Sequence, residues 1–250
     1  MYSTLIIVRI CLIIIVIFFN MISYLLLPKY FSSIVFNNCC EWLISLFNLK
    51  INIHGNIIPE EHIIYASNHY AGIDFAIFKF IFSKYRRTLY TVTDDNALNI
   101  GGYVTFLFNN IKKVFYNSLN LISYKMGNKE SGTNIKSTIL ELFKNEDCNI
   151  IICPSGSVRT IDNILPLPFK PGIFKLAAEN NIKIRPITLK YNRIFKKQLS
   201  SQYNIITLMN VLEEWFNLTV DVYIHDIQQN NDWEKLREDC YNLVCEPLKI

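Results

Sequence analysis

A histidine and an aspartate stand five residues apart in the segment Ser67 to Asp74, and their side chains are candidates for acid–base chemistry. The segment follows a predicted strand, Ile63 to Ala66, and precedes a predicted helix that begins near Asp74. On one continuous helix, side chains five positions apart would differ in direction by roughly 140° and face apart. His69 and Asp74 can therefore meet only if the chain bends between them, and Gly72 permits such a bend.

The chemistry that such a pair performs is general base catalysis. An imidazole near a helix N-terminus is biased towards its neutral form. When a carboxylate accepts a hydrogen bond from one ring nitrogen, the other nitrogen keeps a lone pair that can take up a proton. The alternative is that His69 is an ordinary loop histidine and that Asp74 only caps the following helix, a common role for aspartate. The pair alone does not separate these two interpretations.

Several short blocks favour the catalytic interpretation by resemblance to a known family. Asn68 to Asp74 resembles the N-H-x4-D block of the glycerolipid acyltransferase superfamily, which includes the lysophosphatidic acid acyltransferases, and His69 and Asp74 match its two catalytic positions. Ile151 to Thr160 resembles the family's F-P-E-G-T-R-S block, and Pro168 to Phe174 resembles its P-F-K-x-G-x-F block. Two further stretches resemble blocks of the family in order: Ile182 to Ile187, and Ile122 to Lys125, in which Lys125 stands where arginine is usual. The resemblance spans Ile63 to Tyr191.

The resemblance implies an acyltransferase of phospholipid biosynthesis. It implies that His69 withdraws a proton from the sn-2 hydroxyl of lysophosphatidic acid, and that the alkoxide attacks the thioester of acyl-CoA or acyl carrier protein. Asp74 then stabilises the imidazolium. Phosphatidic acid would be the product, and no metal or prosthetic group is required. Two alternatives stay open: a lysophospholipid remodelling acyltransferase for a larger head group, and a catalytically idle lipid-binding homologue.

The same resemblance also indicates which residues bind the acceptor. Its phosphate requires cations, and the matching blocks supply Lys125, Arg159 and, as a weaker candidate, Lys170. The other substrate-binding residues that we expect are Asn68, Ser155, Gly156 and Gly172. The alternative is that the cations are exposed surface residues and that the glycines are plain turn residues.

Two departures from the family pattern bear on the acceptor. Ser155 stands where the family has glutamate, and Arg159 lies one position late because Val158 follows Ser157. Both departures favour a shift in acceptor selectivity or a weakened activity. Ser155 or Cys153 as a nucleophile served by His69, as in a thioesterase or lipase, is a rival interpretation. It lacks the G-x-S-x-G pattern of such enzymes.

Short β-rich runs alternate with longer helical stretches beyond Leu49. The strands that we predict are Ile51 to Ile53, Ile63 to Ala66, Leu89 to Val92, Leu121 to Tyr124, Ile150 to Cys153 and Ile184 to Leu189. The predicted helices are Asp74 to Lys84, Ala97 to Asn109, Ser131 to Lys144, Pro171 to Glu179 and a last helix capped by Asp232. The alternation predicts an α/β fold, with a mostly parallel sheet flanked by helices, in which active sites gather at strand ends.

The N-terminal region has the character of a membrane anchor. Leu5 to Leu27 is almost wholly apolar and long enough to span a bilayer core as a helix. Because it lacks an A-x-A-like cleavage site, we favour an uncleaved anchor over a signal peptide. Ile34 to Leu49 carries polar residues at helical spacing, which fits an amphipathic interfacial helix or an ordinary core-facing one. We therefore divide the chain into a membrane-anchoring region, residues 1–49, and an acyltransferase domain, residues 50–250.

The net charge and the cysteines limit the binding partners and the cellular compartment that we expect for this protein. The formal net charge of +4 is too small and too scattered for a nucleic-acid groove, yet it is compatible with an anionic membrane surface. The seven cysteines lack paired C-x-x-C spacing, so we interpret them as reduced thiols. Reduced thiols favour a cytosolic location for the catalytic domain. Together with the apolar N-terminal segment, this predicts a single-pass or monotopic membrane protein whose catalytic domain faces the cytosol. The expected partners are the lysophospholipid, the acyl thioester and the lipid membrane.

Overall fold

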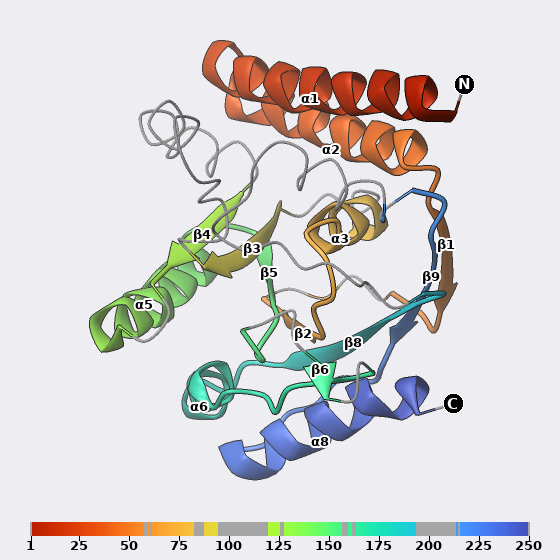
Figure 1. The fold of residues 1–250 in the computed structure, drawn as a ribbon. Helices are drawn as coiled ribbons and strands as arrows, with labels where there is room; N and C mark the ends of the chain where they lie inside the picture. The colour runs from red at the N-terminus through yellow and green to blue at the C-terminus, as the bar shows by residue number, and fades with distance from the viewer. Residues whose placement is uncertain are drawn as a thin grey trace.

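The central element of the protein is a mostly parallel β-sheet (Figure 1). The computed structural model describes residues 2–57, 60, 62–82, 88–94, 120–125, 128–156, 160–161, 164–193, 214 and 216–249. Within these residues the sheet has seven strands in the order β1-β9-β8-β2-β5-β3-β4. Their bounds are β1 Lys50–His54, β2 Ile64–Ser67, β3 Thr88–Asp94, β4 Leu121–Tyr124, β5 Cys148–Ile152, β8 Ile184–Tyr191 and β9 Thr219–Ile224.

Neighbouring strands from β8 through β2, β5 and β3 to β4 all run in the same direction. β9 pairs antiparallel with β8, and β1 pairs parallel with β9, so β1 and β9 run the opposite way. The carboxyl ends of β8, β2, β5, β3 and β4 therefore lie at one edge of the sheet, the edge where open α/β folds bind their ligands. The predicted α/β fold with a mostly parallel sheet is confirmed.

Helices cover both faces of the sheet (Figure 1). One face carries α1 Tyr2–Leu26, α2 Lys29–Leu46 and α3 Asp74–Phe82, and the other carries α5 Lys129–Asn145, α6 Gly172–Glu179 and α8 Trp233–Cys245. A small hairpin, β6 Thr160–Ile161 with β7 Leu165–Pro166, precedes α6, and a short 3-10 helix, η1 Glu246–Leu248, follows α8. Asp232 caps α8 as expected, because its Oδ1 accepts from the backbone amides of Glu234 and Lys235 at 2.9 and 3.3 Å.

The central strands are buried on both sides, as strands between two helical layers must be. Tyr65 of β2 packs in the apolar cluster that contains α1, α2 and α3. Its neighbours Ile64 and Ala66 pack in the cluster that contains α5, α6 and α8. This two-sided burial explains why the strand appears in the sequence as an apolar run without alternation. It also fixes β2, which leads directly into the segment that contains His69.

The predicted strands are present with some shifted ends. β4 has the predicted bounds, whereas the strand predicted at Ile150 to Cys153 runs from Cys148 to Ile152. The strand predicted to end at Leu189 continues to Tyr191, because its last residues pair with β9. β9 itself was not predicted, although its side chains alternate between buried and half-buried as in a strand with one covered face.

The predicted helices are displaced by a few residues at their ends. The helix predicted at Ile34 to Leu49 begins earlier, at Lys29 after Pro28, and ends at Leu46, before Asn48 turns the chain with a φ of 52°. The helix predicted at Ala97 to Asn109 lies outside the described residues.

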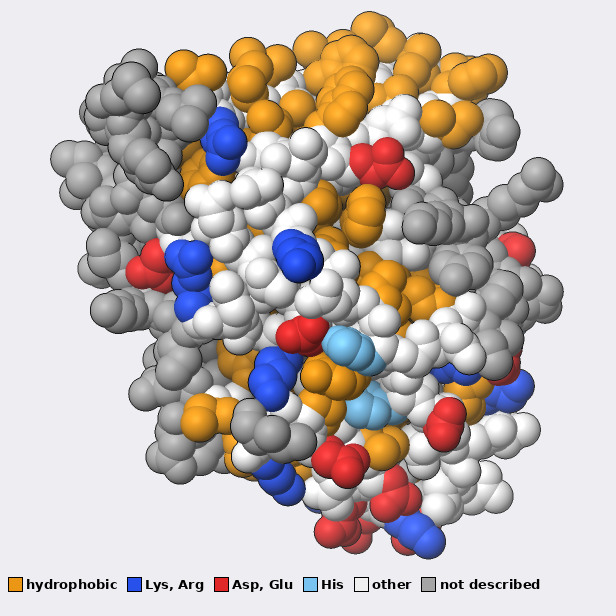
Figure 2. Space-filling view, turned by 90° about the vertical axis from the view of Figure 1, so that its right-hand side faces the viewer, with side chains coloured by type: hydrophobic (Ala, Val, Ile, Leu, Met, Phe, Trp, Pro, Cys, Tyr) orange, Lys and Arg blue, Asp and Glu red, His pale blue; other side chains and the backbone are white. Residues whose placement is uncertain are grey.

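α1 and α2 form an antiparallel pair that lies over α3 (Figure 1). Along α1, Ile13 is 4% exposed whereas Ile15 is 60% exposed, so one side packs against the protein and the other is open. Figure 2 shows apolar side chains along the surface formed by this pair. Among the described residues, Val8–Leu26 is the helix long and apolar enough to cross a membrane, with a mean hydropathy of 2.4. Length and composition make it a candidate anchor, and the crossing itself stays a prediction.

Lys79 of α3 is buried beneath α2. The residue is 3% exposed, and its Nζ lies 5.2 Å from the ring centroid of Phe36 without a hydrogen-bond partner in the described structure. Burial lowers the pKa of Lys79 to about 7. Between about pH 7 and the ordinary lysine pKa near 10.4, the unfolded chain therefore binds a proton that the folded chain does not. The free energy of unfolding should therefore rise with pH through that range.

We expect Lys79→Met to raise the free energy of unfolding by about 3 kcal/mol at pH 7, because it removes the cost of burying an unpaired amine. The gain should shrink as pH approaches 10. Chemical unfolding in detergent, followed by circular dichroism at several pH values, measures both effects. Lys144→Met, on the exposed side of α5, is the matched control and should leave stability nearly unchanged. A gain that did not vary with pH would contradict the assignment.

Candidate active site

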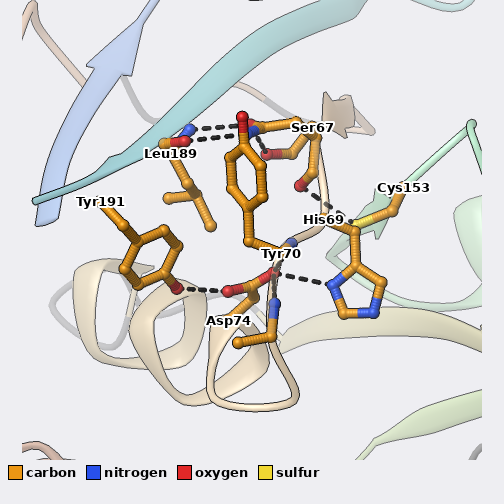
Figure 3. Close-up of polar contacts among 9 residues, drawn as sticks. Ser67, His69, Tyr70, Asp74, Cys153, Leu189 and Tyr191 are labelled. Carbon is orange, nitrogen blue, oxygen red and sulfur yellow. Dashed lines mark hydrogen bonds and ion pairs between the residues drawn. The ribbon is translucent and has the colours of Figure 1, made fainter. Parts of the chain in front are cut away.

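The site is built on the turn that joins β2 to α3 (Figure 3). His69 Nδ1 lies 2.7 Å from Asp74 Oδ2, so the predicted meeting of the two side chains is observed. The bend between them closes with a backbone hydrogen bond of 3.0 Å from Asp74 N to Ala71 O. Gly72 is not among the described glycines with a positive φ, so the turn does not require a left-handed backbone there.

The Asp74 carboxylate organises the turn that surrounds it. Besides His69, its Oδ2 accepts hydrogen bonds from the backbone amides of Tyr70 and Ala71, at 2.8 and 3.2 Å. Asp74 is 2% exposed, so these donors replace the water that burial removed. Both amides precede α3, whereas a helix cap accepts from amides inside the first turn of its helix. The geometry thus differs from the simple capping alternative.

The hydrogen bond with Asp74 fixes the tautomer of His69. A buried carboxylate accepts, so Nδ1 must carry the proton and Nε2 must hold the lone pair of the neutral ring. The His69 side chain keeps 32% of its surface exposed. In Figure 3 Nε2 lies on the side of the ring away from Asp74. The arrangement therefore presents a base to a ligand at the carboxyl edge of the sheet.

A tyrosine that the sequence analysis missed completes the surroundings of Asp74. The Tyr191 hydroxyl, at the end of β8, donates to Asp74 Oδ1 (Figure 3). Burial and the negative charge of Asp74 raise the pKa of Tyr191 well above its ordinary value, so the phenol stays protonated and remains a donor. The sequence signal was weak, because Tyr191 lies two residues beyond the predicted end of its strand.

Asn68 connects the turn to the neighbouring strand β8. It is fully buried. Its Nδ2 donates to the backbone oxygen of Leu189, and its Oδ1 accepts from the backbone amide of Leu189, each at 2.8 Å. Oδ1 also accepts from Ser67 Oγ at 3.3 Å. Because both ends of the amide form hydrogen bonds inside the protein, Asn68 holds the turn against β8, and its part in substrate binding stays a prediction.

The loop after β5 lies against the same turn. Cys153 Sγ donates to the backbone oxygen of Asn68 at 3.6 Å, within the range for sulfur. Burial raises the pKa of the Cys153 thiol, which favours the unreactive protonated form. Ser155, two residues on, is 3% exposed. The raised pKa of Cys153 differs from that of an activated nucleophile, which needs a lowered pKa or an adjacent base.

Two of the three expected cations, Lys125 and Lys170, lie at the same edge of the sheet as His69. Lys125 is exposed and directly follows β4. Because β4 is three strands from β2, the backbone of Lys125 lies about 14 Å from β2 across the sheet. Lys170 is also exposed, and its backbone amide donates to Pro154 O at 3.0 Å, which joins its loop to the loop after β5. Arg159 lies outside the described residues.

The two expected glycines differ in what their positions require. Gly156 has a φ of 64° and its amide donates to Cys153 O at 2.9 Å, so it forms a tight turn that favours glycine. Gly172 is the first residue of α6, and a Cβ built there meets no atom within 4 Å. Close packing therefore does not demand glycine at position 172, whereas a left-handed backbone favours glycine at position 156.

We expect Asn68→Ala to lower the free energy of unfolding by about 3 kcal/mol, because it leaves the buried Leu189 amide and carbonyl without their partners. Chemical unfolding of the variant beside the wild type measures the loss. Asn134→Ala, on the exposed side of α5, is a control for loss of an asparagine and should change stability little. A variant that unfolds like the wild type would mean that the bonds to Leu189 are not important for the fold.

Comparison with known proteins places this geometry in a family. A family model described as Acyltransferase matches residues 50–190. Among solved structures, the crystal structure of PlsC, the 1-acyl-sn-glycerophosphate (LPA) acyltransferase from Thermotoga maritima, superposes with a TM-score of 0.66 at 14% sequence identity. The match covers 99% of this chain and 94% of that one. No curated protein matches the sequence. The superposition shows a shared α/β fold, and the family match shows that the chain belongs to the acyltransferase family.

Proposed function

We propose that the protein transfers a fatty acyl group from acyl-CoA or acyl carrier protein to the sn-2 hydroxyl of lysophosphatidic acid, giving phosphatidic acid. The observation that carries the proposal is the 2.7 Å contact between His69 Nδ1 and Asp74 Oδ2 at the carboxyl edge of the sheet. It leaves Nε2 as a base for an acceptor hydroxyl. Membership of the acyltransferase family supplies the reaction class.

In the proposed mechanism, Nε2 of His69 removes the hydroxyl proton as the oxygen attacks the thioester carbonyl. Asp74 remains a carboxylate throughout and stabilises the imidazolium that forms. The tetrahedral intermediate then collapses, the bond from carbon to sulfur breaks, and the imidazolium returns its proton to the leaving thiolate. Each step uses groups of the protein and the two substrates, so the mechanism requires no metal or prosthetic group.

Lysophosphatidic acid is the acceptor that we favour among lysophospholipids. The Thermotoga maritima protein of similar fold is a 1-acyl-sn-glycerophosphate (LPA) acyltransferase. Lys125 and Lys170 are exposed at the carboxyl edge of the sheet, where cations are available for a phosphate. Ser155 stands in place of the family's glutamate, so a lysophospholipid with a larger head group is the second candidate.

A location at a lipid surface follows from the same proposal, because both the acceptor and the product are lipids. The exposed apolar side chains of α1, among them Phe18 and Leu25, provide a surface that inserts into lipid. All seven cysteines are free thiols, which fits a catalytic domain in a reducing compartment such as the cytosol. We therefore propose a single-pass or monotopic protein whose catalytic domain faces the cytosol.

We expect His69→Ala to reduce acyl transfer by about 1,000-fold, since the general base is removed. Transfer of radiolabelled oleoyl groups from oleoyl-CoA by detergent-solubilised protein measures the loss. The matched control is His54→Ala, because His54 forms another histidine–aspartate pair, 3.0 Å from Asp221, on β1 and β9. That variant should keep wild-type activity. Equal activity of wild type and His69→Ala would reject His69 as the base.

The acceptor is tested with the same assay and a panel of lysophospholipids. We expect label to enter phosphatidic acid, because a phosphate without a further head group matches the exposed cations at the site. Entry into a choline or ethanolamine lipid instead would establish the remodelling alternative. Absence of transfer with both acyl-CoA and acyl carrier protein as donors would favour a catalytically idle lipid-binding protein.

A further inference from the structure

The end of β8 is attached to the turn between β2 and α3 by side chains from both segments. Asn68 bonds both backbone groups of Leu189. Two residues farther along β8, the Tyr191 hydroxyl reaches Asp74. The ring of Tyr70 lies edge-on to the ring of Tyr191, with centroids 5.9 Å apart and planes at 88°. The turn and the strand end therefore form one packed unit.

Within that unit, the residues of the turn donate hydrogen bonds to one carboxylate oxygen of Asp74, and the Tyr191 hydroxyl donates to the other. Oδ2 accepts from His69 and from two backbone amides. Oδ1 accepts from the Tyr191 hydroxyl. A carboxylate held at one oxygen can still rotate about its carbon–carbon bond, whereas one held at both oxygens has a fixed plane. The plane of Asp74 sets the direction of its bond to His69.

We propose that Tyr191 is a positioning residue that orients Asp74, and through Asp74 the imidazole of His69, for acyl transfer. The inference rests on the proposed function, because it assigns Tyr191 a part in that reaction. Tyr191 does not contact the reacting atoms: its hydroxyl is bonded to Asp74 on the side away from the His69 ring (Figure 3).

The phenol also adjusts the charge that Asp74 presents to His69. A hydrogen bond donated to Oδ1 draws electron density from the carboxylate and weakens its pull on the imidazole proton. Without that donor, the carboxylate stabilises the protonated ring more strongly. The unprotonated base then becomes available only at higher pH.

Tyr191→Phe tests the inference, because it removes only the hydroxyl and keeps the ring against Tyr70. We expect kcat to fall about tenfold, as a misdirected base loses its alignment, with both KM values changed by less than about twofold. The acid limb of the pH–rate profile should move to higher pH by about half a unit. Tyr90→Phe is the matched control, since Tyr90 also donates to a carboxylate, Glu146 at 2.8 Å, away from the site.

A double-mutant cycle separates positioning from a general effect on stability. If Tyr191 acts through Asp74, then Tyr191→Phe should change kcat in the Asp74→Ala background, which has no side-chain acceptor, by less than about twofold. A tenfold loss in that background as well would show that Tyr191 acts by another route and would overturn the inference. So would a Tyr191→Phe enzyme with the kcat and pH profile of the Tyr90→Phe enzyme.

Titration of the His69 ring by nuclear magnetic resonance gives a readout that does not depend on turnover. The ring signal is assigned by its loss in His69→Gln. We expect the midpoint of the His69 titration to rise in Tyr191→Phe and to stay at the wild-type value in Tyr90→Phe. If no donor and acceptor pair supports transfer but the midpoint rises, the proposed function fails while the coupling of Tyr191 to His69 stands. An unchanged midpoint rejects the coupling whether or not the wild type is active.

Discussion

The burial of the Asp74 carboxylate is the constraint on which the rest of the site depends. Asp74 is 2% exposed, and a charge removed from water is stable only when hydrogen-bond donors replace that water. Two backbone amides, the imidazole of His69 and the phenol of Tyr191 supply the donors. Because each donor occupies a fixed position, the contacts that stabilise the carboxylate are the same contacts that aim the histidine.

The sheet supplies these fixed positions through the two neighbours of β2. In the parallel pairing of β2 with β8, Ser67 lies opposite Ile187, so the chain that leaves β2 runs beside the last residues of β8. On the other side, Ala66 pairs with Ile152, which brings Cys153 and its loop against the turn. The strands on either side therefore confine the turn that contains His69, and the shape of that turn does not rely on a left-handed backbone at Gly72.

Helix α3 connects the N-terminal helices to the site. α2 packs on α3, and α3 begins at Asp74. The exposed apolar surface of α1 and α2 thus has a direct structural link to the histidine–aspartate pair. This arrangement fits the proposed acyl transfer to a lipid, because packed helices hold the proposed base at a set distance from the apolar surface.

The sequence by itself determined the features whose signals are local: the parallel α/β fold, the N-terminal apolar helix, the cap at Asp232 and the pairing of His69 with Asp74, five residues apart. The tertiary structure alone decided the contact of Tyr191 with Asp74, across 117 residues, and the burial of Asn68 against Leu189, across 121. Periodicity and short motifs describe neighbours along the chain. Which strand lies beside β2 depends on the order of the whole sheet, and no local pattern carries that information.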